Sequence, residues 1–151
     1  AEEMQAAVLS ATLDAAAIIM AAAVSDYRPT SAAAHKIKKT QGEMALQLVR
    51  TPDILSAVAQ RRRQSGSPRV VIGFAAETRN VLENAREKLT RKGLDLIVAN
   101  DVLAAGSGFA VDTNRVTLVD AGGGAESLPL MSKQAVAEAV IDRLAALLSR
   151  L

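Results

Sequence analysis

The sequence predicts an α/β domain of the layered, Rossmann-like type, with a mostly parallel sheet, helices on both faces and a late β-hairpin. Apolar runs of strand length alternate with amphipathic helical segments, the order that produces parallel βαβ units. Hydrophobic residues make up 50% of the chain and are mostly Ala, Val, Leu and Ile, which fill strands buried on both faces. With 151 residues, the chain is expected to form a single domain over residues 1–151.

The first predicted elements are a helix and a buried strand. Over residues 2–15, apolar side chains recur among alanines at near-helical spacing, which predicts an amphipathic helix. Residues 16–24 are apolar throughout and have the length of a strand, which ends at Ser25-Asp26. Residues 27–42 are polar and are expected to form a loop.

A strand and a second helix are predicted next. Residues 44–50, MALQLVR, alternate in polarity and predict a half-exposed strand at a sheet edge or a dimer interface. Thr51-Pro52-Asp53 predicts a helix start, with Thr51 as the cap, proline at the first position and aspartate near the positive helix end. We expect this helix to end at Arg61-Arg62-Arg63, interpreted as a solvated helix end.

The central part of the chain predicts a strand, a helix and a further strand. Residues 70–74 form an apolar run that indicates a buried strand. A helix is expected over residues 79–92, and Gly93 is its natural C-terminal cap. Residues 94–101 then form another apolar run that ends in polar side chains, which predicts the next strand.

The last predicted elements are a hairpin and a helix. Residues 114–120 and 126–131 flank the segment Ala121-Gly122-Gly123-Gly124, which we interpret as a turn between two short strands. The final helix is expected to begin near Ser132. The residues predicted for its inner face are Val136, Val140, Ile141, Leu144, Leu147 and Leu148.

Polar residues follow or end the three predicted buried strands. These are Ser25-Asp26, the segment Phe74-Ala75-Ala76-Glu77 and Asn100-Asp101. In open α/β sheets, ligands bind outside the carboxyl ends of the strands, which meet at one edge. The sequence therefore predicts a ligand site at this rim.

Composition excludes several classes of site. The chain has no cysteine and one histidine, which excludes thiolate and multi-histidine metal sites as well as a cysteine nucleophile. A net charge of +2, from 18 basic and 16 acidic residues, means that polyanions could be bound only by local clusters. With 2% aromatic residues, no stacking surface for nucleic acid is expected.

No membrane attachment is expected either. No apolar run reaches the roughly 18 residues that a membrane-spanning helix needs. The acidic start Ala1-Glu2-Glu3 differs from a secretory signal peptide. We therefore expect a cytoplasmic location, with no nucleic-acid or membrane partner.

Residues 36–39 concentrate positive charge in a predicted loop. Lys36, Lys38 and Lys39 fall within this segment, and Gly42 follows soon after. Lysine pairs with phosphate as a mobile point charge, and a flexible loop can close such charges over a triphosphate. The alternative is a solvated loop without a ligand. Its position after a buried strand and an acidic rim residue favours phosphate binding.

Further charged residues could take part in such a site. Asp26 could hold Mg²⁺, accept a hydrogen bond from a ribose hydroxyl or simply form a turn. Lys88 and Lys92 lie four residues apart on one helix face, where a bound anion would relieve their mutual repulsion. Alternatively, they are ordinary cations near a helix C-terminus, where Glu87 and Arg91 can also pair.

Several motifs occur together in one order: AAAVSDYRP, KIKK, TPDIL, GFAAET and REKLTRKGLDLIVAND. In this combination the chain resembles phosphopantothenoylcysteine synthetase, also called phosphopantothenate–cysteine ligase, from about residue 7 to residue 130. In bacteria this domain is usually the C-terminal half of a bifunctional coenzyme A biosynthesis protein. The resemblance implies a CTP-dependent ligation of 4′-phosphopantothenate to cysteine through an acyl-cytidylate.

The resemblance also implies the site residues. Those that match the family's CTP site are Ala22, Ala23, Asp26, Lys36, Pro52, Asp53, Ile54, Leu55, Phe74, Lys88 and Lys92. Lys36 matches the family's catalytic lysine, with the implied role of stabilising charge at the α-phosphate and the carboxylate. Asp26 is implied to hold Mg²⁺ through the triphosphate.

Partners follow from the resemblance as well. It implies CTP, 4′-phosphopantothenate and cysteine as ligands, a homodimer, and a fused decarboxylase domain that carries the FMN this domain lacks. The family begins with a strand, a glycine-rich turn and a Ser-Ser-Gly-Lys segment, to which nothing in this chain corresponds. The expectation is a synthetase domain without its first strand and glycine-rich portion.

Two other functions remain open at this stage. A nicotinamide-dependent oxidoreductase could share the fold, although no G-x-G-x-x-G follows a predicted strand in this sequence. A non-catalytic domain for nucleotide sensing or oligomerisation would have no use for a catalytic lysine at position 36.

Overall fold

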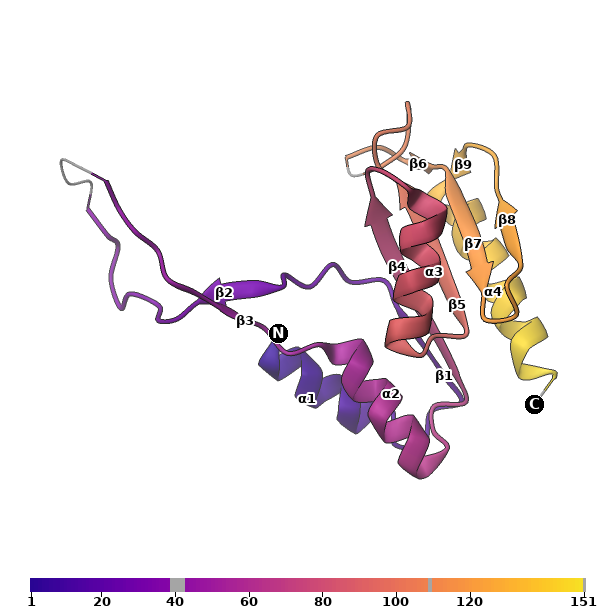
Figure 1. The fold of residues 1–151 in the computed structure, drawn as a ribbon, viewed down its shortest axis with the longest axis horizontal. Coiled ribbons are helices and arrows are strands. Elements are labelled where there is room, and N and C mark those ends of the chain that lie inside the picture. The colour runs from indigo at the N-terminus through magenta and orange to yellow at the C-terminus, as the bar shows by residue number, and fades with distance from the viewer. Residues whose placement is uncertain (39–42, 109, 151) are drawn as a thin grey trace.

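The computed structural model describes residues 1–38, 43–108 and 110–150 and has the predicted α/β architecture (Figure 1). The helices are α1 (Glu2–Ala11), α2 (Ile54–Ser65), α3 (Val81–Lys92) and α4 (Lys133–Leu148). The strands are β1 (Ala17–Met20), β2 (Tyr27–Pro29), β3 (Leu48–Arg50), β4 (Val70–Glu77), β5 (Leu96–Asp101), β6 (Thr113–Asn114), β7 (Val116–Asp120), β8 (Ala125–Ser127) and β9 (Met131–Ser132).

The main sheet has five strands in the order β1-β4-β5-β7-β8. Strands β1, β4 and β5 are parallel, and Ile72 of β4 pairs with Ile19 on one side and Leu96 on the other. Strand β7 is antiparallel to β5 and forms a hairpin with β8 across the glycine-rich turn. The mostly parallel sheet and the late hairpin are therefore confirmed. The hairpin's second strand is shorter than predicted, because Met131 pairs with Asn114 in a separate sheet.

Helices cover both faces of the sheet, as predicted (Figure 1). On one face, Val71, Ile97 and Val119 pack with residues of α2 and α3, including Val58 and Leu89. On the other face, the alternate strand residues Ile72, Val98 and Leu118 pack against Val136 and Val140 of α4. The period of two along a strand sends successive side chains into the two layers.

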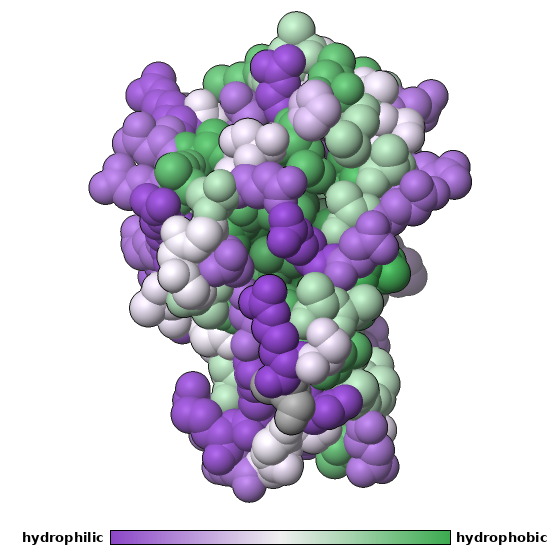
Figure 2. All heavy atoms as spheres, turned by 90° about the vertical axis from the view of Figure 1, so that its right-hand side faces the viewer, coloured by the Kyte–Doolittle hydropathy of each residue, from purple (hydrophilic) through white to green (hydrophobic). Residues whose placement is uncertain are grey.

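The outward-facing side of the molecule around β8 and α4 is mixed in polarity. Figure 2 shows hydrophilic side chains over much of this face, with hydrophobic atoms visible between them. Residues of β8 are exposed, and α4 buries Val136 and Val140. Ile141 was predicted for the inner face and is 51% exposed, because it lies one position beyond the buried row of Val136 and Val140.

Two element boundaries differ from the predictions for local reasons. The first helix ends at Ala11 rather than near residue 15, and Thr12 closes it with its hydroxyl on the carbonyl of Val8. The first strand covers Ala17–Met20, because only these residues of the apolar run pair with β4. The rest of the predicted apolar run, residues 21–24, therefore belongs to the loop at the rim.

The helix start at residues 51–53 has a different cap from the one predicted. Asp53, rather than Thr51, is the N-cap of α2, because its carboxylate accepts the backbone N–H of Ser56 at 3.1 Å. Thr51 instead bonds through its backbone N–H to the carbonyl of Asp26 at 2.9 Å. The C-terminal cap predicted for Gly93 is confirmed, since its φ of 61° is left-handed.

Residues 44–50 do not form one strand of the main sheet. Only Leu48–Arg50 is a strand, and it pairs with Tyr27–Pro29 in a two-stranded ribbon that extends away from the main sheet (Figure 1). Met44, Leu46 and Leu48 are 71%, 60% and 52% exposed in this single chain, so an edge of the main sheet does not cover them, and the predicted dimer interface stays a prediction. The sequence pattern would suit a covered surface, which this single chain does not supply.

Part of the lysine loop lies outside the described residues, namely residues 39–42, which include Lys39. Lys36 and Lys38 are exposed in the segment that joins β2 to β3. Over the described part of the chain, no helix combines the length and the apolar character needed to cross a membrane.

The group Arg61-Arg62-Arg63 was predicted to be solvated, and this is wrong for Arg62. Its guanidinium makes two bonds to the Asp95 carboxylate, at 2.7 and 2.9 Å, and a third to the carbonyl of Arg69 at 2.7 Å. The same carboxylate accepts the backbone N–H of Val71 at 2.7 Å. The Asp95 side chain thus joins α2, β4 and the start of β5 at the end of the sheet opposite the rim.

Asp95→Ala should lower the free energy of unfolding by about 1.5–3 kcal/mol, because it leaves a charged guanidinium and a backbone N–H without their acceptor. The Arg62–Asp95 pair has side chains only 27% and 23% exposed. Glu126→Ala is the control, because it removes an exposed pair with Arg143 and should cost below about 1 kcal/mol. Urea unfolding of both variants checks this, and equal losses would contradict it.

Candidate functional site

The predicted rim contains a cavity of about 160 Å³ between the end of β1 and the start of α2. Strand β1 leads into it through the alanine run, and Thr51 ties the segment before α2 to Asp26. The predicted site residues that line this cavity are Ala22, Asp26, Pro52, Asp53, Ile54, Leu55, Phe74 and Lys92. Residues from four separate stretches of sequence therefore meet in one place, which we call the rim cavity.

The remaining predicted residues lie around the rim cavity. Ala23 lines a second cavity, which shares Ala22 and Phe74 with the first. Lys88 lies one turn before Lys92 on α3 and forms an ion pair with Glu77. Lys36 is exposed in the segment between β2 and β3 and is not among the lining residues, so this conformation does not bring it to the cavity.

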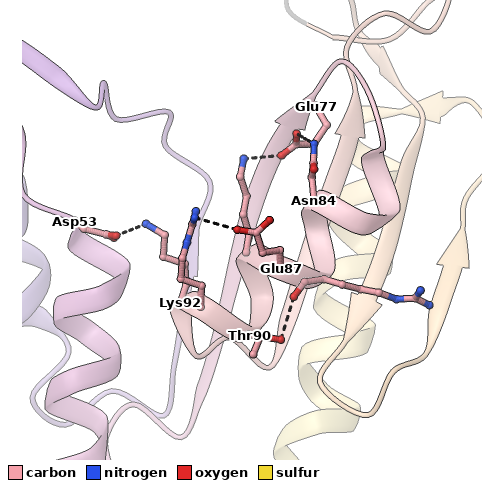
Figure 3. A network of polar contacts seen from close by, with 9 residues as sticks. Asp53, Glu77, Asn84, Glu87, Thr90 and Lys92 are labelled. Atoms are coloured by element: carbon pink, nitrogen blue, oxygen red, sulfur yellow. Dashed lines mark hydrogen bonds and ion pairs between the residues drawn. The ribbon is translucent and has the colours of Figure 1, made fainter.

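Asp53 lines the rim cavity and makes two kinds of contact there. As the N-cap of α2, it accepts hydrogen bonds from the backbone N–H and the hydroxyl of Ser56, the latter at 2.7 Å. It also forms an ion pair with the Lys92 ammonium from α3, so that the two helices are joined across the cavity (Figure 3). A carboxylate at a helix N-terminus is stabilised there by the helix dipole.

These contacts change the acidity of Asp53. Burial by itself raises its pKa, but the hydrogen bonds from Lys92 and Ser56 and the positive charge of Lys92 outweigh that effect. The pKa of Asp53 is therefore lowered from its ordinary value. The carboxylate is kept ionised, as the pairing with Lys92 requires.

A second ion pair involves Glu77, to which the sequence analysis assigned no binding role. Its side chain is 9% exposed and accepts the Lys88 ammonium at 2.5 Å on one oxygen and the Asn84 amide at 2.9 Å on the other. Asn84 also donates a hydrogen bond to the carbonyl of Arg79, which holds it in place. A buried carboxylate needs such partners, because burying an unpaired charge is costly. The sequence signal for this residue was the single charged position of the GFAAET motif.

The two lysines of α3 are thus already neutralised without a ligand. The repulsion between these lysines, which a bound anion was predicted to relieve, is offset by the carboxylates of Glu77 and Asp53. Glu87 and Arg91 pair separately at 3.3 Å, as predicted. Only Lys92 of the two lines the rim cavity, so an anion that binds its ammonium there has to displace the Asp53 carboxylate.

Asp26 is the candidate metal ligand. It is exposed and lines the rim cavity, close in sequence to the end of β1. Among the residues described, no three acidic or histidine side chains are grouped to hold a metal ion by themselves. Mg²⁺ is commonly held by one or two carboxylates together with phosphate oxygens and water, so Mg²⁺ binding at Asp26 does not require such a group and stays a prediction.

The second cavity, of about 220 Å³, lies at the carboxyl ends of β4 and β5. Its lining residues include Ala21, Asn100, Gly108, Asn114 and Lys133. It adjoins the rim cavity, because Phe74 and Ala22 line both. Asn100 was predicted as a polar residue at a strand end. Asn114 of β6 and Lys133, the first residue of α4, were not predicted as site residues.

Comparison with known proteins identifies close relatives. The profile of the family described as DNA/pantothenate metabolism flavoprotein, C-terminal domain, matches residues 1–148. The coenzyme A biosynthesis bifunctional protein CoaBC of Bacillus subtilis is 44% identical over 147 residues, which cover 97% of this chain and 35% of that protein. The CoaBC protein of Vibrio cholerae is 43% identical over 141 residues, which cover 92% and 34%.

A solved structure shares the fold. The crystal structure of the C-terminal domain of CoaBC matches with a TM-score of 0.77 and 32% identity, over 100% of this chain and 64% of the other. The chain thus spans about a third of the length of the curated relatives it matches.

The lowered pKa of Asp53 predicts a pH-dependent contribution to stability. A carboxyl whose pKa is lowered on folding stabilises the protein above its unfolded pKa of about 3.9, and the contribution is lost as the pH falls through the folded value. Asp53→Asn keeps a capping side chain but cannot ionise, so it should be less stable than the natural chain above that pH. Thermal unfolding across a pH series measures this difference.

The difference between Asp53→Asn and the natural chain should shrink on acidification below the unfolded pKa. Lys92→Gln removes the strongest of the contributions that lower the pKa and should reproduce part of the effect. A difference that stays constant into strong acid would show that Asp53 stabilises the chain only as a neutral cap.

Proposed function

The chain belongs to the family described as DNA/pantothenate metabolism flavoprotein, C-terminal domain, and we propose that it is the ligase domain that joins 4′-phosphopantothenate to cysteine with CTP. The observation that carries this proposal is the rim cavity, where a cap aspartate, an acidic loop residue and a paired lysine meet around Phe74. The likeness to proteins named for coenzyme A biosynthesis supports the same pathway.

The reaction consists of two displacements. A carboxylate oxygen of 4′-phosphopantothenate attacks the α-phosphorus of CTP, which forms the acyl-cytidylate and releases pyrophosphate. The amine nitrogen of cysteine then attacks the acyl carbon; a C–N bond forms, the C–O bond to CMP breaks, and the amine loses a proton. Both steps build negative charge on phosphate oxygens, so they are accelerated by fixed positive charge.

The residues of the rim cavity have distinct roles in this proposal. Lys88 and Lys92 pass from Glu77 and Asp53 to the phosphate oxygens, which carry more charge than the carboxylates they replace. Asp26 would hold Mg²⁺ together with the triphosphate, and the ion would neutralise phosphate charge. Phe74 and the segment from Pro52 to Leu55 line the part of the cavity that suits the base.

Lys36 is proposed as the catalytic residue. It lies in an exposed segment that carries further positive charge at Lys38, and such a segment can close over a bound triphosphate. In the closed state its ammonium stabilises charge on the α-phosphate and on the attacking carboxylate. The segment extends from the two-stranded ribbon of β2 and β3.

The remaining parts of the proposal concern assembly and location. The exposed apolar residues Met44, Leu46 and Leu48 favour a homodimer with this segment at the interface. We also propose a fused decarboxylase domain that binds FMN, and a cytoplasmic location. Relatives that are named bifunctional support the fusion. An oxidoreductase or a non-catalytic sensing domain is the alternative, and the measurements below separate them.

The chain should bind CTP with Mg²⁺ more tightly than ATP or NAD, because the rim cavity combines paired lysines, an acidic metal ligand and a small base pocket. Isothermal titration with each nucleotide measures this. Lys92→Gln should weaken CTP binding about tenfold or more, as expected for a lost charge-assisted contact. Equal affinity for all three nucleotides, or no CTP binding, would contradict the proposal.

Lys36→Gln should lower the rate of pyrophosphate release in the longer protein by about 100-fold or more, because one fixed charge at the transition state is lost. Lys38→Gln is the matched control from the same exposed segment and should have a much smaller effect. Unchanged pyrophosphate release in Lys36→Gln would remove Lys36 from the mechanism and favour a non-catalytic role for the segment.

A further inference from the structure

We propose that the second cavity, at the carboxyl ends of β4 and β5, binds the amino-acid substrate through its α-carboxylate, with Lys133 and Asn114 as the recognising residues. The inference rests on the proposed function, because it assigns a place to the nucleophile of that reaction. Neither residue belongs to the predicted CTP site, and both come from the part of the chain after β5. We call this second cavity the amino-acid cavity.

The size and position of the amino-acid cavity suit a small nucleophile. Its volume of about 220 Å³ lies below the range of about 300–1,000 Å³ that is usual for drug-sized ligands. A free amino acid of a few heavy atoms fits within this space. Ala22 and Phe74 line both cavities, so a ligand here is adjacent to the nucleotide, where the acyl group is activated.

A hydrogen-bond network fixes the polar end of the amino-acid cavity. The amide oxygen of Asn114 accepts the backbone N–H of Gly108 at 2.9 Å and the Asn100 amide at 3.3 Å. Ser107 donates its hydroxyl to the Asn100 oxygen at 2.8 Å, which orients that amide. The Asn114 oxygen is therefore used within the protein, and its amide NH₂ has no partner among the described residues.

Lys133 adds the charge that a carboxylate requires. It is the first residue of α4, and its backbone N–H bonds to the carbonyl of Asp112 at 2.9 Å, which anchors it beside β6. In the described part of the chain its ammonium forms no ion pair, unlike those of Lys88 and Lys92. An ammonium and a primary amide that both donate form a receptor for one carboxylate.

The rest of the lining determines where the other groups of the amino acid lie. The lining also contains alanines from the β1 and β4 ends, including Ala21 and Ala76, which suit a short and weakly polar side chain. With the carboxylate held at Lys133, the amine lies toward the wall shared with the rim cavity. This is the orientation that an attack on an acyl group at the nucleotide requires.

The experiment is a titration of the ¹⁵N-labelled 151-residue chain with L-cysteine under reducing conditions, followed by NMR. Cysteine should shift the signals of Asn100, Asn114 and Lys133 and leave those of Lys92 and Asp53 unchanged. Cysteamine, which has the amine and the thiol but no carboxylate, should give no shifts there. Shifts elsewhere, or equal shifts with cysteamine, would overturn the proposal.

Two variants give the matched comparison. Lys133→Gln should weaken cysteine binding about tenfold or more, because the charge-assisted contact to the carboxylate is lost. Arg150→Gln removes the same charge from the other end of the α4 region and should leave binding unchanged. Unaltered cysteine binding in Lys133→Gln would overturn the role of Lys133 even if the shifts map to this cavity.

CTP titrations of the same samples separate this inference from the proposed function. Binding of CTP at the rim cavity without cysteine at Asn114 and Lys133 would leave the proposed function in place and reject this inference. Cysteine at these residues without CTP binding would support the amino-acid cavity as a carboxylate site and reject the CTP-dependent reaction.

Discussion

The parallel pairing of β1, β4 and β5 is the constraint on which the rest of the structure depends. Because these strands run in one direction and Ile72 is in register with Ile19 and Leu96, their carboxyl ends meet at one edge. Backbone hydrogen bonds and the two layers of aliphatic side chains hold this register, and a slip of one residue would exchange the layers. Both cavities exist because loops leave the strands together at that edge.

Two ion pairs lie at the rim. Lys92 pairs with Asp53 and Lys88 with Glu77, which offsets the repulsion between the closely spaced lysines. Glu77 is well buried and has a second partner in Asn84. Asp53 also caps α2, so the ion pair with Lys92 and the start of this helix depend on one carboxylate.

The two ends of the sheet serve different purposes. At the rim, carboxylates and lysines line cavities. At the opposite end, the Asp95 carboxylate accepts hydrogen bonds from Arg62 and from the backbone of Val71, which join a helix to two strands. The same residue types are thus found beside cavities at one end of the sheet and against packed backbone at the other.

The sequence by itself determined the order and type of most elements, because the apolar periodicity of residues 70–74, 79–92 and 94–101 already matches β4, α3 and β5. It also identified most residues of the rim cavity through the order of their motifs. Partnerships between distant residues were decided only in the tertiary structure: Arg62 with Asp95, Glu77 with Lys88, and Lys133 beside Asn114. Residues 44–50 show the same limit, since an alternating pattern does not specify which surface covers it. Local pattern follows from neighbours along the chain, whereas ion pairs and cavities depend on which elements the folded sheet brings together.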